Sequence, residues 1–542
     1  MSIKKFLLLF CLTALLVGCG GGDKYDNYIS SYDTTATSTP TDVQESFLQS
    51  TSLYGSDEGG PRANIAVILP MSGVAKTAGQ DIKTSIESAF LRKPKTNVRM
   101  SFYDLSGDSE QKFNIIRDVL NTSPDVIVGP IFAEDTKIIH DLKSSSLPVI
   151  SFTSDTQSVG DGVMTVNLIP TQSIETIMQQ IAKSNERGII ILAPNDKSGQ
   201  MMTSVADVAA DIYDVPVRGI FYYNPGDSDS IKNVAQEASL HKTRCEVNDR
   251  AREVLSDILI NEALTTYQKK SLKSQLERIS RKETLGDLPY DAVLFLGNGD
   301  DSKTLASFLR YYGIGNSDVN FYGTTLWQNS DIASDLTMSG AQYATLPEIS
   351  ENFVSLFNTV GGKDPDYLAA IGYDAANLAL GMIYAQKDGP AYFFDPSGYI
   401  GTTGIFRIQP DGTPERALRI VELDGTPTPK TIKDAPNNFL TPLYNIHRNN
   451  LSTVPARRIS AYGIDPGDYI NIPEDLRSKP KYRTKVIGPG YVKPRSAKPN
   501  KNNPTTVYIS DQDREIVSNP EYKPVKLESI SRKYIDSVEI EE

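Results

Sequence analysis

A catalytic site needs a nucleophile, a base or a metal-binding group beside a partner, and the sequence offers few such pairs. The three histidines, His140, His241 and His447, are far apart and lack the spacing of metal ligands. Ser109–Lys112 and Ser239–Lys242 match S-x-x-K but lack the S-D-N and K-T-G partners of penicillin-binding enzymes, and neither a G-x-S-x-G turn nor a P-loop occurs. The sequence therefore predicts a non-catalytic protein without a metal or cofactor.

The first residues indicate export and lipid attachment. A basic start precedes an apolar run from Phe6 to Val17 that is too short to span a bilayer. The run ends in Leu16-Val17-Gly18-Cys19, which resembles the bacterial lipobox. The resemblance implies cleavage after residue 18, acylation of Cys19 and, because Gly20 follows, the periplasmic face of the outer membrane. An ordinary secretory signal is the alternative.

The rest of the composition is that of a folded body on a tether. Gly20 to Arg62 is rich in Gly, Ser, Thr, Asp and Tyr without periodicity, which is typical of a flexible linker. No later apolar segment is long enough to cross a membrane. The formal charge of −12 argues against a nucleic-acid-binding protein, which needs a basic surface.

Alternating strand and helix patterns begin at residue 63 and must position any site. Ile65 to Leu69 is a continuous apolar run typical of a strand buried on both faces, and an amphipathic helix starts near Gln80. Asp125–Gly129 and Pro148–Phe152 are two further strands of this kind. Loops at the carboxyl ends of such strands line the ligand crevice of an α/β sheet. The cleft candidates on these loops are Ser72, Gly73, Thr77, Gly129, Pro130, Ile131, Thr153 and Ser154.

A second series of the same kind starts at Gly188–Ala193 and resumes at Asp291–Gly297. Its cleft candidates follow the strands at Gly188–Ala193 and near Tyr322, and they are Asn195, Asp196, Ser198, Thr324 and Trp327. Between about residues 239 and 288 two charged helical patterns predict an inserted helical hairpin, either a solvated decoration or a docking surface. Beyond residue 425 the chain is rich in Pro and charge, which predicts a largely disordered tail or a contact with an anionic surface.

The phrase Leu69-Pro70-Met71-Ser72-Gly73 resembles the opening of type I periplasmic-binding proteins of the leucine-binding kind. Later phrases, including Gly372-Tyr373-Asp374-Ala375, resemble the same family in the same order up to about Leu423. The resemblance implies an α/β fold with two lobes, each a parallel sheet flanked by helices. We expect a signal peptide at 1–18, a tether at 19–62, lobe one at 63–167 and 341–398, lobe two at 168–340 and 399–425, and a tail at 426–542.

Two binding functions fit that resemblance. Gly323-Thr324-Thr325-Leu326-Trp327 looks like the branch of penicillin-binding-protein activators, lipoproteins that stimulate membrane-anchored peptidoglycan synthases. The alternative is a receptor that delivers an amino acid to an ABC permease. In amino-acid-binding relatives, hydroxyl residues follow the Gly of the strand that corresponds to Asp125–Gly129, and a Tyr precedes the Gly of the lobe-two loop. Here Ile131 to Asp135 replaces the hydroxyls and Ser198 replaces the Tyr. The sequence therefore favours the activator.

Overall fold

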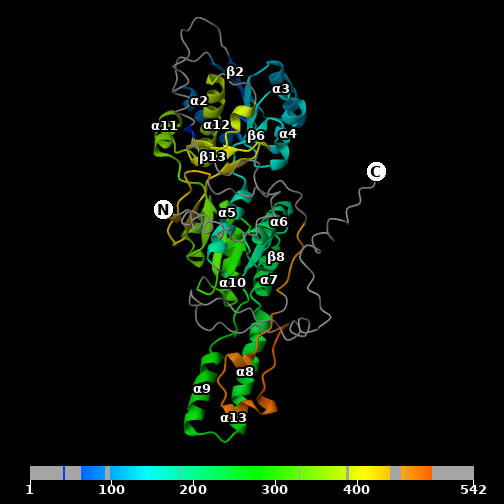
Figure 1. Ribbon diagram of the computed structural model, residues 1–542, viewed down its shortest axis with the longest axis vertical. Helices are drawn as coiled ribbons and strands as arrows, with labels where there is room; N and C mark the ends of the chain where they lie inside the picture. The colour runs from blue at the N-terminus through cyan, green and yellow to red at the C-terminus, as the bar shows by residue number, and fades with distance from the viewer. Residues whose placement is uncertain are drawn as a thin grey trace, which may run out of the picture. The chain divides into compact units, whose positions relative to one another are not determined.

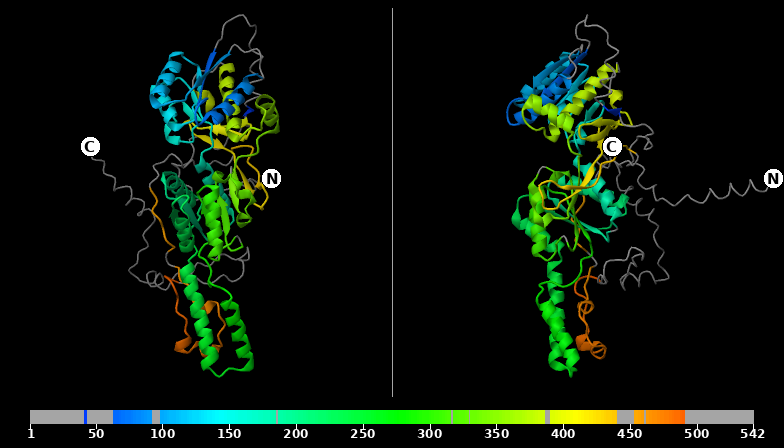
Figure 2. Two further views of the ribbon diagram at one scale, coloured as in Figure 1. Left: turned by 180° about the vertical axis from the view of Figure 1, so that it is seen from behind. Right: turned by 90° about the vertical axis from the view of Figure 1, so that its left-hand side faces the viewer.

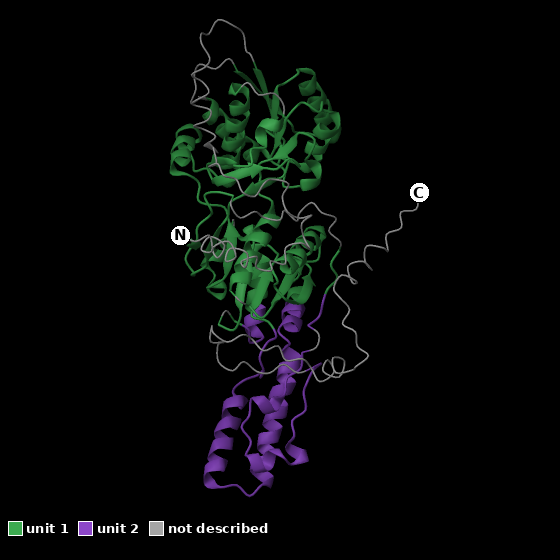
Figure 3. Cartoon of the chain, viewed as in Figure 1, with its two compact units in different colours: residues 1–231, 290–307, 315–456 green, residues 232–289, 308–314, 457–542 purple. Residues whose placement is uncertain are grey.

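The computed structural model describes residues 41–42, 63–91, 98–184, 186–315, 317–328, 330–385, 390–439, 453–459 and 462–490. The expected signal peptide, Cys19 and most of the expected tether lie outside the described residues. Within them, no helix combines the length and apolar character needed to cross a membrane. The described chain divides into two compact units (Figure 3). Unit 1 holds residues up to 231, 290–307 and 315–456, and unit 2 holds 232–289, 308–314 and the residues from 457 onward.

Lobe one of unit 1 is a five-stranded parallel sheet in the order β3-β2-β4-β5-β6. The strands are β2 (Ala63–Leu69), β3 (Val98–Asp104), β4 (Val126–Val128), β5 (Val149–Ser151) and β6 (Val163–Thr165), and the helices are α2 (Lys76–Leu91), α3 (Ser109–Asn121), α4 (Ala133–Leu142), α11 (Glu351–Gly361) and α12 (Tyr367–Tyr384).

Strand β2 is apolar throughout because helices cover both faces of its sheet. Ile65, Val67 and Leu69 pack in one core with α2 and α12, while Ala66 and Ile68 pack in a second core with α3 and α4. The two pairs of helices lie on opposite sides of the sheet (Figure 1). This arrangement confirms the α/β fold expected from the apolar run.

Lobe two is a seven-stranded sheet in the order β16-β15-β11-β10-β9-β7-β8, in which β15 pairs antiparallel with both β11 and β16 and all other pairs are parallel. The strands are β7 (Ile189–Pro194), β8 (Val217–Tyr223), β9 (Ala292–Phe295), β10 (Asn320–Gly323), β11 (Gln342–Thr345), β15 (Arg419–Glu422) and β16 (Lys430–Lys433), and the helices in this part of the chain are α5 (Pro170–Lys183), α6 (Lys197–Ile212), α7 (Ser228–Ala238) and α10 (Gly299–Tyr311).

A third, small sheet belongs to lobe one by its packing. Its strands are β1 (Thr41–Asp42), β12 (Tyr399–Gly401), β13 (Gly404–Ile408) and β14 (Pro414–Arg416). Tyr399, Phe406 and Ile408 lie in the core of α2 and α12. The expected lobe boundaries at 341 and 399 therefore differ from the structure, because β11 joins the lobe-two sheet and β12–β14 pack on lobe one. The pairing of β1 with β12 also places two residues of the expected tether in a sheet.

Unit 2 combines the inserted hairpin with residues that the sequence assigned to a disordered tail. The hairpin is α8 (His241–Asn261) and α9 (Thr266–Ser280), and the later segment contains α13 (Glu474–Arg477). The two long helices lie side by side, with the later segment along them (Figures 1 and 2). Six buried side chains of that segment complete the hairpin's core: Tyr462, Ile464, Ile470, Ile472, Leu476 and Tyr482.

Polar contacts fasten the same segment to the hairpin. Gln275 on α9 exchanges two hydrogen bonds with the Asn471 backbone, accepting from its N–H at 2.7 Å and donating to its carbonyl at 3.1 Å. Glu262, directly after α8, accepts from Lys479 at 2.6 Å and from the Tyr482 hydroxyl at 3.0 Å, and lies 3.0 Å from Lys481. Unit 2 is therefore one packed body drawn from two distant stretches of the chain.

The Glu262 contacts predict a pH-dependent attachment of the later segment. Hydrogen bonds from Lys479 and Lys481 lower the pKa of Glu262 from 4.5 to about 2. A lowered folded-state pKa stabilises the contact above pH 4.5, and this stabilisation is lost as the pH falls toward 2. We expect the protection of the amides around Tyr482, measured as the observed exchange rate relative to the intrinsic rate at the same pH, to fall across that window. Glu262→Gln should speed exchange already at neutral pH, whereas Glu253→Gln, in an exposed pair with Arg250, should not. An unchanged rate in Glu262→Gln would contradict the prediction.

Candidate functional site

The carboxyl ends of the lobe-one strands form one edge, which we call rim one. Because β2, β4 and β5 are parallel and adjacent, the loops that follow them meet at this edge. Rim one consists of the predicted residues Ser72, Gly73, Thr77, Gly129, Pro130, Ile131, Thr153 and Ser154. The Gly129 N–H donates to the Ile150 carbonyl at 2.8 Å, and the Phe152 N–H donates to the Pro130 carbonyl at 2.8 Å. The structure therefore brings the predicted loops of lobe one together.

The chain at Gly129 requires glycine. Its φ is +105°, in the left-handed region, and a Cβ there would lie 2.0 Å from the Ile68 carbonyl oxygen on the next strand. The following peptide bond to Pro130 is cis. Rim one is thus shaped by a close approach of two backbones.

A carboxylate lies beneath the first loop of rim one. Asp104, at the end of β3, accepts a hydrogen bond from the Met71 N–H at 2.7 Å and another from the Ser106 hydroxyl at 2.6 Å. The Ser72 N–H in turn donates to the Ser106 hydroxyl oxygen at 3.3 Å. Burial opposes ionisation of Asp104, but the hydrogen bonds from Ser106, Ser72 and Met71 lower its pKa. The loop is therefore held around a negative charge.

The N-terminus of α4 faces the same rim and already carries acids. A helix N-terminus attracts anions because its first N–H groups are unpaired. Here Glu134 and Asp135 occupy the first turn. Asp135 is buried and pairs with Lys112 at 3.0 Å, and burial raises its pKa although Lys112 partly offsets this. Phe132, 43% exposed, stands where a hydroxyl would serve a carboxylate ligand. These side chains disfavour an anionic ligand.

The carboxyl ends of the lobe-two strands form a second edge, rim two. Of the predicted residues, Asn195, Asp196 and Ser198 follow β7 and are exposed. Asp196 caps α6 by accepting from the Gly199 N–H at 2.7 Å, and the Asn195 amide donates to the Asn224 side chain at 3.4 Å. Asp196 and Asn195 thus form hydrogen bonds with the N-terminus of α6 and with the residue that follows β8.

Two residues that the sequence analysis did not name complete rim two. Asp301, buried in α10, accepts from the Gly226 N–H at 3.2 Å and from the Asn298 amide at 3.1 Å. Beneath them the Tyr223 hydroxyl is buried, and burial together with Asp301 and Asp196 raises its pKa. Among the described residues it has no hydrogen-bond partner. In the sequence, Asp301 could have been found from Asn298, which directly follows the strand at Asp291–Gly297 and whose amide donates to Asp301.

Thr324 and Trp327 follow β10 but lie inside lobe two. Trp327 is fully buried and donates from Nε1 to the Ser302 hydroxyl at 3.0 Å. A Cβ on Gly323 would lie 2.5 Å from its ring, so the glycine makes room for the indole. Thr324 is also buried, and its hydroxyl accepts from the Leu326 N–H at 3.3 Å. The phrase from Gly323 to Trp327 is thus a packing motif of the lobe.

The chemistry available at the rims is recognition by hydrogen bonds and negative charge. Both rims contain carboxylates: Glu134 in lobe one and Asp196 in lobe two are exposed, Asp104 is half-buried and Asp301 is buried. A metal-type grouping of His, Cys, Asp and Glu occurs within the described residues at His241, Cys245 and Glu283 of unit 2. It lies outside both rims in the fold.

Comparison with known proteins identifies a matching family and several solved structures with a similar fold. Residues 63–427 match the sequence model of periplasmic binding proteins. A Rhodospirillum rubrum protein assigned as a branched-chain amino acid ABC transporter is 14% identical, with a TM-score of 0.53, over 68% of this chain and 99% of that chain. The leucine binding protein LivK of Thermotoga maritima is 14% identical, with a TM-score of 0.44, over 69% and 98%. Full-length LpoA of Haemophilus influenzae is 16% identical, with a TM-score of 0.45, over 72% and 61%. No curated protein sequence matches.

Proposed function

The chain belongs to the periplasmic binding protein family, and from that premise we propose that it is a non-catalytic envelope lipoprotein that binds and activates a peptidoglycan synthase. The family is one of binding proteins and implies a periplasmic location. The lipid anchor at Cys19, the outer membrane and the synthase as partner belong to the proposal. Its lobes would act as a scaffold, and unit 2 would supply the contact with the enzyme.

The observation that carries the proposal is unit 2. A receptor that closes over a solute needs only its two lobes, yet this chain builds a separate core from α8, α9 and the segment after residue 456. Two large apolar side chains flank the turn of the hairpin, Ile260 at 78% exposure and Tyr267 at 83% exposure. Exposed aromatic and aliphatic side chains of this kind are typical anchors of protein interfaces.

Rim one supports the same proposal because its side chains disfavour an amino-acid ligand. The acids in the first turn of α4 disfavour the carboxylate of an amino acid at that helix N-terminus. The resemblance of Gly323–Trp327 to penicillin-binding-protein activators is the reason for proposing a peptidoglycan synthase as the partner. In the structure these residues pack inside lobe two, so they do not form a ligand site.

The experiment that tests the proposal is capture of partners from detergent-solubilised membranes with the full chain. We expect a peptidoglycan synthase to be retained, and Ile260→Ser with Tyr267→Ser to reduce its recovery strongly. The matched control is Leu336→Ser in unit 1, because Leu336 is 74% exposed and lies outside the hairpin. Capture of an ABC permease, or equal synthase recovery by all variants, would contradict the proposal.

The second candidate is a receptor for an ABC amino-acid transporter, which the family match favours. The acids of rim one predict that the full chain does not bind common amino acids. A ligand at a hundredfold excess over its Kd stabilises the folded state by about 2.7 kcal/mol, which a melting curve detects. We expect no change in melting temperature with millimolar leucine, valine or glutamate. A clear rise with any of them would restore the receptor function.

A further inference from the structure

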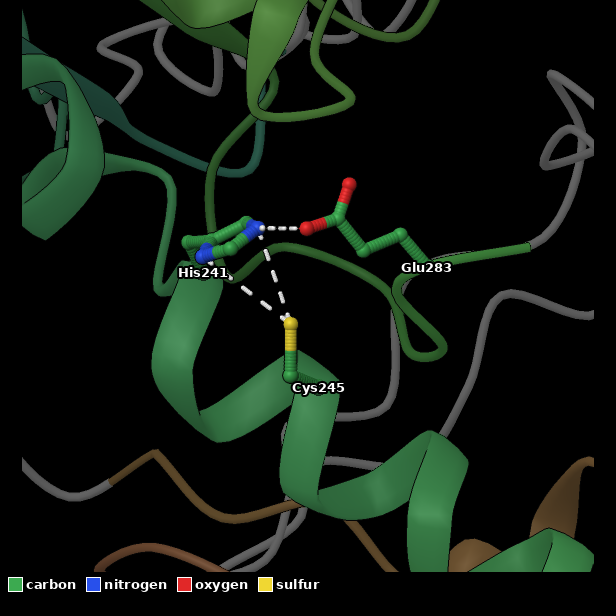
Figure 4. A group of neighbouring side chains, drawn as sticks. All are labelled: His241, Cys245 and Glu283. Atoms are coloured by element: carbon green, nitrogen blue, oxygen red, sulfur yellow. Dashed lines mark hydrogen bonds and ion pairs between the residues drawn. The ribbon is translucent and has the colours of Figure 1, made fainter.

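A side-chain cluster in unit 2 has the composition and geometry of a metal site. His241 and Cys245 stand one turn apart in α8, and Glu283 follows α9 (Figure 4). The His241 Nε2 atom lies 3.6 Å from the Cys245 sulfur and 3.2 Å from a Glu283 carboxylate oxygen. The ligand atoms of all three residues lie within 4.8 Å of one another.

The distances from His241 Nε2 to the other two ligand atoms are those expected around one tetrahedral zinc ion. Because the Cys245 sulfur also lies 3.9 Å from Nδ1, the imidazole ring must turn for Nε2 to point at the ion. With Zn–S near 2.3 Å, Zn–N near 2.05 Å and tetrahedral angles, a sulfur and a nitrogen ligand lie about 3.6 Å apart. A nitrogen and an oxygen ligand at similar bond lengths lie about 3.3 Å apart. Both values are within about 0.1 Å of those between His241, Cys245 and Glu283. The side chain of Glu283 is 69% exposed, so its carboxylate oxygen can move toward the Cys245 sulfur without disturbing a core.

The imidazole links the other two groups. His241 Nε2 can donate to Glu283 at 3.2 Å while Nδ1, 3.9 Å from the Cys245 sulfur, accepts from the thiol, so without an ion the three side chains form a hydrogen-bonded chain. A cation bound between the three ligand atoms would replace both hydrogen bonds by coordinate bonds. We propose that His241, Cys245 and Glu283 bind a zinc-class transition-metal ion, with water as the fourth ligand.

The metal class follows from the donor set. One thiolate, one imidazole and one carboxylate suit Zn²⁺ or Co²⁺, whereas Mg²⁺ and Ca²⁺ prefer oxygen ligands alone. Three protein ligands leave a fourth coordination position, which water would occupy.

Existing contacts hold the ligands near their positions. Asn248, on α8, donates to the carbonyls of Lys282 and Glu283, and the Leu285 N–H donates to the Arg244 carbonyl at 3.0 Å. The His241 ring packs against Tyr312, with ring centroids 4.8 Å apart. A bound ion would add a direct link between the start of α8 and the loop after α9. Metal binding should therefore stabilise the base of the hairpin.

Binding must release a proton. Burial, followed by Glu283 and Asp249, raises the pKa of the Cys245 thiol, with Glu246 acting in the same sense and Arg244 opposing them. The thiol loses its proton to solvent as its sulfur bonds to the ion, because the thiolate is the ligand. Affinity should therefore fall as the pH is lowered, with about one proton released per ion at neutral pH.

The test is titration of the reduced full chain with Co²⁺, followed by displacement with Zn²⁺. We expect one Co²⁺ per chain with a thiolate-to-cobalt absorption band in the near ultraviolet, quenched by Zn²⁺ and unaffected by Mg²⁺. Cys245→Ser should abolish the band, and this variant separates Cys245 from the other two cysteines of the sequence, Cys11 and Cys19. Glu283→Gln and His241→Ala should weaken affinity by at least about tenfold, since loss of even an indirect partner has that effect.

A matched control is His140→Ala in lobe one. His140 lies 3.5 Å from Asp141 and 3.7 Å from Asp161, so it is a histidine beside two acids without a thiol. Its removal should leave Co²⁺ binding unchanged. Circular dichroism of each variant reports folding, and if Cys245→Ser unfolds, the Glu283→Gln variant decides. The proposal is overturned if the wild-type band is absent, if it persists in Cys245→Ser, or if Glu283→Gln binds as tightly as wild type.

Discussion

A chain that ends at residue 456 should lose the folded hairpin of unit 2 while unit 1 stays intact. The truncation removes six side chains from the core of α8 and α9: Tyr462, Ile464, Ile470, Ile472, Leu476 and Tyr482. Burial of one large apolar side chain is worth about 1.5–3 kcal/mol. Two helices whose apolar faces become exposed have no remaining partner of that size within unit 2. We expect hydrogen exchange and proteolysis in α8 and α9 to rise by orders of magnitude.

The control is a chain that ends at residue 490, which keeps every described residue of unit 2. It should show the protection of the full chain in α8 and α9. Under the proposed function, the shorter chain should also fail to capture the synthase, and the longer one should retain it. Equal protection of the hairpin in the two truncated chains would show that the later segment does not stabilise it.

Glu415→Ala should destabilise lobe one by about 3–5 kcal/mol, because it removes the carboxylate that neutralises a buried arginine. Arg407, fully buried in β13, pairs with Glu415 in β14 at 2.7 Å. The same carboxylate accepts from the Gln409 amide at 3.2 Å. The midpoint of denaturant unfolding, followed by a probe in lobe one, measures the loss.

A double variant distinguishes the destabilisation caused by one unneutralised buried charge from the stabilisation that the ion pair itself provides. Arg407→Leu with Glu415→Leu removes both charges, and replacing a buried ion pair by apolar side chains is often close to neutral. We therefore expect the double variant to be more stable than Glu415→Ala. Destabilisation of the double variant beyond that of the single one would mean that the pair itself stabilises the small sheet.

The strands of unit 1 could be predicted from the sequence because a continuous apolar run indicates a strand that is buried on both faces. Ile65 to Leu69 is apolar at every position, since helices cover both faces of the sheet. Parallel pairing then fixes which loops meet, so the loops of rim one could be placed together before any coordinates. These inferences need only local pattern and the rule for parallel sheets.

Features that depend on distant partners could not be predicted in the same way. The side chains from Tyr462 to Tyr482 are short apolar islands in a stretch rich in Pro and charge, and their partners lie about 200 positions earlier, as Gln275 and Asn471 do at a separation of 196. Glu283 lies 42 positions after His241, so histidine spacing alone did not reveal the cluster. Trp327 follows a strand as a cleft residue would, but the missing side chain of Gly323 lets it turn into the core.

Activation of a peptidoglycan synthase, the function proposed for this chain, is measured most directly by the rate of that enzyme. A purified synthase from the same cells is supplied with its lipid-linked precursor, with and without the full chain. We predict faster glycan polymerisation or cross-linking with the full chain, and no acceleration by the chain that ends at residue 456. An unchanged rate at saturating full chain, together with stimulation of an ABC permease, would contradict the account.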